Sequence, residues 1–68
     1  MNMGTKKEIR NIIKDVREQL RNASQMIDEN DWETAYIFAQ QLTCAANELE
    51  YTVRDKKVDE LIATFNGA

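Results

Sequence analysis

Asp28-Glu29-Asn30-Asp31-Trp32-Glu33 divides this sequence into two long stretches that each repeat apolar residues at helical spacing. The chain has no proline, and its two glycines, Gly4 and Gly67, lie near its ends. This acidic segment is therefore the clearest break between two helices. Asn30 is expected to cap the second helix, with Glu33 three residues later completing a capping box. The segment predicts a short turn between two antiparallel helices.

The stretch before the turn has the pattern of an amphipathic helix over about residues 6–28. Thr5-Lys6-Lys7-Glu8 has the form of a capping box at its start. The apolar residues recur at steps of three and four and form one stripe: Ile9, Ile12, Ile13, Val16, Leu20, Ala23 and Ile27. We expect this stripe to pack against the second helix.

The stretch after the turn predicts a second helix over about residues 31–53 that is apolar on two sides. The stripe expected to face the first helix comprises Ala35, Ala39, Leu42, Ala46, Leu49 and Val53, with Phe38 and Ala45 on its flank. A second stripe repeats every seven residues roughly opposite the first: Ile37, Cys44, Tyr51, Val58 and Phe65, with Ile62 beside them. No charged residue lies between Thr34 and Asn47. Both sides of this helix are therefore expected to be covered.

Two continuations fit the residues after Val53. A third helix over about residues 55–65 folds back and places Val58, Ile62 and Phe65 on the hairpin. Alternatively, the second helix continues, straight or kinked, to a glycine stop at Asn66-Gly67. We favour the third helix or the kink, because a straight continuation leaves an apolar end that another chain must cover. The predicted fold is a single all-α domain over residues 1–68, a helical hairpin with a short third helix that assembles as a dimeric helical bundle.

Composition limits the classes of function that fit this chain. Its 68 residues form at most one domain, which buries little surface when alone. It has no histidine and one cysteine, so a cysteine–histidine nucleophile and an internal disulfide are excluded. Cys44 is expected to be buried as a small hydrophobe. We predict no metal site, no cofactor and no enzymatic activity. No membrane span or signal stretch is apparent, and a free thiol is typical of the cytoplasm.

Charge is distributed unevenly along the chain. Residues 5–27 carry six basic and three acidic side chains, residues 28–53 carry six acidic and no basic ones, and residues 54–68 carry three of each, which gives the net charge of −3. The turn carboxylates are interpreted as solvated groups that favour the start of a helix. A basic stripe lies on the first helix: Arg10, Lys14, Arg17 and Arg21. We interpret it as a solvated flank that pairs with nearby acidic residues. Contact with a nucleic acid or another anionic partner is the less favoured interpretation.

These patterns favour a small, non-enzymatic regulatory protein, an adaptor or inhibitor, that binds another protein or a second copy of itself through the second stripe. Phages and other mobile elements often encode proteins of this size, which is a prior from length and not from the residues. Trp32 and Tyr36 are expected either to anchor the interface or to close the end of the hairpin core. The alternative function is a dimeric helical-bundle regulator that binds RNA or DNA through the basic stripe. No stretch carries a complete family motif.

Overall fold

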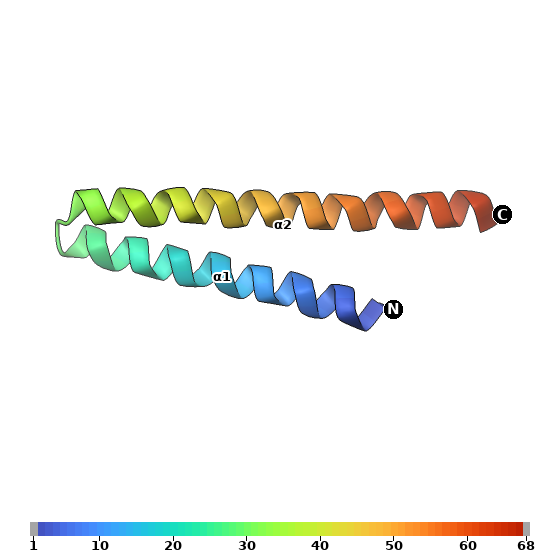
Figure 1. The fold of residues 1–68 in the computed structure, drawn as a ribbon, viewed down its shortest axis with the longest axis horizontal. Coiled ribbons are helices and arrows are strands. Elements are labelled where there is room, and N and C mark those ends of the chain that lie inside the picture. Colours follow the sequence, from blue (N-terminus) through green and yellow to red (C-terminus); the bar gives the residue numbers. More distant parts are fainter. Residues whose placement is uncertain (1, 68) are drawn as a thin grey trace.

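The computed structural model describes residues 2–67 as two antiparallel helices joined by a short turn (Figure 1). Helix α1 spans Asn2–Asp28 and helix α2 spans Trp32–Gly67. The molecule is long and thin, 56 × 17 × 12 Å, and its radius of gyration is 16.3 Å. A compact domain of this length has a radius of gyration of about 11 Å. The predicted all-α hairpin is confirmed, in an extended form with little interior.

Both helices are longer than the sequence pattern predicts. Helix α2 continues without interruption past the height at which α1 begins, so the favoured third helix over residues 55–65 is wrong (Figure 1). The residues from Arg54 to Phe65 include neither glycine nor proline, and strong helix formers are common among them. Helix α1 begins at Asn2, so Thr5 lies inside the helix and is not its cap.

The turn depends on the backbone conformation of Asn30. Its φ angle is 61°, in the left-handed region that asparagine adopts more readily than most residues. The Asp31 amide donates to the carbonyl oxygen of Met26 at 2.8 Å, and the Asn30 amide donates to that of Ile27 at 3.0 Å. This pair of bonds is the Schellman arrangement that ends an α-helix. Asn30 therefore ends α1, and its predicted role as the cap of α2 is wrong.

Asp31, one residue later, caps α2. Its Oδ1 accepts a hydrogen bond from the Thr34 amide at 3.1 Å, and its carbonyl oxygen accepts one from the Ala35 amide at 3.0 Å. Glu33 lies in the first turn, where a carboxylate interacts favourably with the positive end of the helix dipole. The residue that ends α1, Asn30, and the residue that caps α2, Asp31, are thus adjacent in the sequence. This tight turn holds the two helices antiparallel.

The two helices meet along a seam whose inward residues alternate at steps of three and four, as in an antiparallel coiled coil. The seam residues are Ile9, Ile12, Val16, Gln19, Ala23 and Met26 of α1 and Ala35, Phe38, Leu42, Ala45, Leu49 and Thr52 of α2. The most buried of them, Ile12, Ala23, Ala35 and Ala45, retain between 4% and 7% of their exposure. No side chain in the described part of the chain is less than 2% exposed. The core is therefore one layer thick.

On α1 three residues of the predicted stripe lie outside the seam. Ile13 is half-buried beside it, and Leu20 and Ile27, which were expected to face α2, are 56% and 46% exposed. Gln19 and Met26 occupy the seam beside them and are half-buried. When two helices pack together, two positions in each seven of one helix are covered by the other. An apolar stripe that is three positions wide in each seven therefore keeps one position exposed.

The same correction applies to α2. Ala39, Ala46 and Val53 were expected in the seam but are exposed. Phe38 and Ala45, predicted to lie on the flank, face α1 instead. The apolar stripes of both helices are thus wider than the contact between them, and each has an uncovered edge.

Candidate protein-interaction surfaces

The chain exposes more surface than a compact protein of its size. Its accessible surface is 5701 Å². A compact monomer of 7.9 kDa exposes about 4,400 Å², so the excess is about 1,300 Å². Large apolar side chains contribute to this exposed surface. Those that are 44% exposed or more are Leu20, Ile27, Trp32, Tyr36, Ile37, Tyr51, Val53, Val58, Leu61, Ile62 and Phe65. Most of these side chains fall on two separate surfaces.

The first surface is the seven-residue repeat that the sequence predicts on α2, which we call the outer stripe. It comprises Ile37, Cys44, Tyr51, Val58, Ile62 and Phe65, all of them exposed. The five larger side chains range from 44% exposed at Val58 to 84% at Phe65. The described residues of the chain therefore do not cover the outer stripe. The predicted burial of Cys44 within the chain is wrong, because its place in the repeat lies outside the seam.

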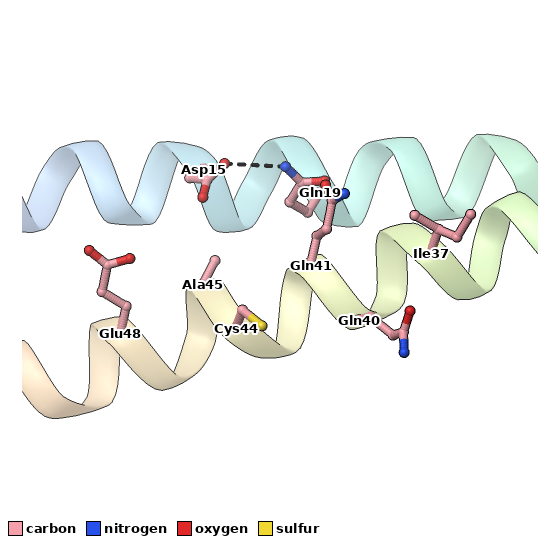
Figure 2. Close-up of a pocket in the computed structure, with 8 residues that line it drawn as sticks. All are labelled: Asp15, Gln19, Ile37, Gln40, Gln41, Cys44, Ala45 and Glu48. Atoms are coloured by element: carbon pink, nitrogen blue, oxygen red, sulfur yellow. Dashed lines mark hydrogen bonds between the residues drawn. The ribbon is translucent and has the colours of Figure 1, made fainter.

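A shallow pocket marks the place where the outer stripe approaches α1 (Figure 2). It is lined by Asp15 and Gln19 of α1 and by Ile37, Gln40, Gln41, Cys44, Ala45 and Glu48 of α2. Figure 2 shows Gln41 pointing toward Gln19 across the seam. The Nε2 atom of Gln19 donates to Oδ1 of Asp15 at 3.3 Å, whereas its buried Oε1 has no hydrogen-bond partner. This side of the hairpin is polar next to the seam and apolar farther around α2.

The outer stripe continues onto the part of α2 that extends past α1. Near the start of α1, a second shallow pocket joins Thr5 and Glu8 to Thr52, Asp55, Lys56 and Asp59. After Asp59 the described residues of α1 offer no facing position. Here α2 exposes Leu61, Ile62 and Phe65 by 61%, 53% and 84%. This end of α2 is amphipathic, and its apolar side is uncovered.

Exposed aromatic residues lie in the middle of α2 and beside the turn. The guanidinium of Arg54 lies over the Tyr51 ring at 4.8 Å from its centroid, a cation–π contact that leaves the ring 52% exposed. Trp32 and Tyr36, at the turn, are 62% and 65% exposed. They do not close the hairpin core, so that part of the prediction is wrong. Their role as interface anchors stays a prediction.

The basic stripe of α1 is solvated along its whole length. Arg10, Lys14, Arg17 and Arg21 are all exposed, and the last three share a shallow depression with Glu18. The expected pairing with nearby acidic residues is absent, since the ion pair within residues 2–67 joins Lys56 Nζ to Glu60 Oε1 at 3.2 Å. Likewise, the acidic residues of the turn and of the other described segments form no cluster suited to a metal ion.

Comparison with known proteins assigns no family. No family model, no curated protein and no solved structure matches this chain. Neither α1 nor α2, as far as each is described, is long and apolar enough to cross a membrane. The functional interpretation therefore depends on the exposed surfaces of the hairpin.

Proposed function

We propose that this chain is a small, non-enzymatic regulatory protein that binds another protein through the outer stripe of α2. The observation that carries this proposal is the row of exposed apolar side chains that recurs about every two turns along one side of α2, from Ile37 to Phe65. Contiguous apolar patches on soluble proteins commonly mark interaction sites. Tyr51 and Phe65 are the side chains most suited to anchor a partner, because buried aromatic residues supply much of the binding energy at interfaces.

An amphipathic helix is the kind of partner that fits this surface. The outer stripe presents an apolar side chain every seven residues along α2, and a second helix lying along α2 would meet these side chains at the same spacing. Near the turn, the stripe is bordered by uncharged amides, Gln40, Gln41 and Asn47. Farther along, charged residues border it as well: Glu48, which lines the pocket beside Cys44, and then Arg54 and Asp55. The partner helix should therefore be uncharged along one half of the contact and carry charge along the other.

The test compares aspartate substitutions at exposed positions. Ile37 and Tyr51 belong to the outer stripe, whereas Asn11 is exposed on α1 and lies outside it. Proteins retained from the native cells by the immobilised chain are identified, purified and titrated against each variant. We expect binding to be lost in Ile37→Asp and Tyr51→Asp and retained in Asn11→Asp. A purified partner that binds both stripe variants as tightly as the unmodified chain refutes the proposal.

The single thiol provides an independent measurement of the same contact. Cys44 is exposed at the middle of the outer stripe. Its rate of alkylation should fall when the purified partner is added, whereas a thiol introduced by Glu18→Cys on α1, in a Cys44→Ala background, should react at an unchanged rate. Unchanged alkylation of Cys44 in the complex would place the partner elsewhere on the chain.

Nucleic-acid binding is a second candidate because the four residues of the basic stripe are exposed and form no ion pair within residues 2–67. The net charge of −3 opposes it. Fluorescence anisotropy with labelled RNA and DNA at low and moderate salt tests this function. Binding through phosphates should weaken steeply with salt and be lost in the Lys14→Ala/Arg17→Ala variant. Absence of binding at low salt excludes it.

A further inference from the structure

A second apolar surface covers one side of both helices, and we propose that a second copy of this chain binds it. We call it the broad face. It comprises Ile13, Leu20 and Ile27 of α1 and Trp32, Tyr36, Ala39, Ala46 and Val53 of α2. Ile13 is half-buried and the others are exposed. No residue of the outer stripe belongs to the broad face, so this inference is independent of the function proposed above.

The antiparallel seam places these residues on one side of the hairpin. Leu20 and Ala46 each follow a seam residue by four positions, so each lies directly beside the seam. Asp15 and Gln41 each precede a seam residue by four positions, and they share the pocket on one side. Because antiparallel helices bring equivalent positions to the same side, the residues that follow the seam must meet on the opposite side.

The broad face is self-complementary in shape. Helix α1 contributes large side chains to it, whereas α2 contributes alanines at its centre. The pocket register, with Asp15 and Gln19 beside Gln41 and Ala45, sets Leu20 at a height between Ala39 and Ala46. A twofold axis parallel to the helices keeps these heights. It therefore places the Leu20 ridge of each copy over the alanine groove of the other, where large and small side chains interdigitate.

Charges at the edges of the broad face favour the same arrangement. Arg10 and Glu50 occupy equivalent edge positions, each three residues before an apolar residue of the face. The hairpin register sets them at similar heights, and neither forms an ion pair within the described part of the chain. With α1 over the α2 of the second copy, Arg10 lies beside Glu50 of that copy. Packing α1 against α1 would instead bring Arg10 and Arg17 toward the arginines of the other copy, and this repulsion disfavours it.

The size of the broad face is sufficient for a specific dimer. The paired part of the hairpin is about 35 Å long at 1.5 Å per residue, and the molecule is 17 Å wide. The face then covers about 600 Å² in each copy, and the total is at the lower end of the range for stable interfaces. The resulting four-helix bundle continues the thin core of the hairpin, and it leaves the outer stripe of each copy accessible.

The first test is the mass in solution across a dilution series, measured by light scattering. We expect the unmodified chain to have twice the mass of the 7.9 kDa monomer. Leu20→Glu and Ala46→Glu should be monomers that keep their helical circular dichroism, because both positions are exposed within the hairpin. Tyr51→Asp should remain a dimer. A monomer at every concentration, or a dimer that Tyr51→Asp disrupts and the other two variants do not, overturns the inference.

A charge reversal tests the arrangement of the two copies. Arg10→Glu and Glu50→Arg should each weaken the dimer about tenfold, since each contact occurs twice about the twofold axis. The double variant restores the opposite charges and should return the dissociation constant to within about threefold of the unmodified value. If the double variant is as weak as the single variants, α1 does not lie over the α2 of the second copy.

Discussion

Gln19 is a polar residue in the middle of an otherwise largely apolar seam, and Gln19→Leu should stabilise the hairpin. The side chain is half-buried between Val16 and Ala23 on α1. Its Nε2 donates to Asp15 Oδ1 at 3.3 Å, but its Oε1 is buried without a hydrogen-bond partner. Leucine has a similar size and no polar atom, so it fills the same place without an unsatisfied group.

The expected gain follows from three contributions. Removing the buried, unpaired oxygen favours folding by about 1 kcal/mol. Half-burying a leucine side chain contributes about 1 kcal/mol more. Losing the solvent-exposed hydrogen bond to Asp15 costs about 0.5 kcal/mol. The net stabilisation is about 1.5 kcal/mol, which raises the melting temperature of a domain this small by roughly 6–12 °C.

Gln25→Leu is the matched control. Gln25 also donates to a carboxylate four residues away, Glu29 Oε2 at 3.0 Å, but it is exposed outside the seam. Its substitution should leave the melting temperature unchanged or slightly lower. Thermal unfolding is followed by circular dichroism at one protein concentration, because self-association would also raise the melting temperature. If Gln19→Leu melts no higher than the unmodified chain, or if both variants gain equally, the seam assignment of Gln19 is wrong.

Three further predictions test the turn and the extended end of α2. Asn30→Val should lower the free energy of unfolding in urea by about 1–2 kcal/mol because valine disfavours a positive φ, whereas Asn30→Gly should be close to neutral; equal values for the two variants would contradict the left-handed assignment. Asp31→Ala should cost about 1 kcal/mol in the same assay through loss of the cap, and Asp31→Ser should recover most of it; an Asp31→Ala variant as stable as the unmodified chain would count against the cap. Backbone amides of residues 61–66 should exchange with solvent faster than those of residues 42–49, because only the latter pack against α1; equal protection measured by NMR would show that something covers the end of α2.

Hydrophobic periodicity located the turn, the two helices and the outer stripe, because each depends on a pattern that repeats over several turns. It did not locate the seam. Gln19 and Leu20 are adjacent, and hydrophobicity alone assigns the leucine to the core, whereas the contact between the helices selects the glutamine. Periodicity finds the centre of an apolar stripe, and that centre coincides with the seam only when one neighbour covers the whole stripe.

The prediction of a third helix failed for a different reason. It inferred a conformation from the cost of exposing Val58, Ile62 and Phe65, but that cost bears on whether a partner is needed and not on whether the helix bends. Bending requires residues that favour a break, and the segment from Arg54 to Phe65 has neither glycine nor proline. Local helix propensity therefore decides the conformation, and the apolar side remains exposed.

The same distinction explains why α2 is apolar on two sides while α1 is apolar on one. A helix that contacts one neighbour needs about two apolar positions in each seven, and a helix of a four-helix bundle needs about three. Helix α1 has the pattern of a bundle helix because of Leu20 and Ile27, which are exposed in the single hairpin. Helix α2 carries the outer stripe in addition to its part of the seam and the broad face, so its additional apolar positions match a third neighbour.

A dimer formed through the broad face would carry two outer stripes, and such a dimer would bind a partner with two helices more tightly than either stripe alone. Dimerisation would then strengthen the binding proposed for the outer stripe without any change in its residues.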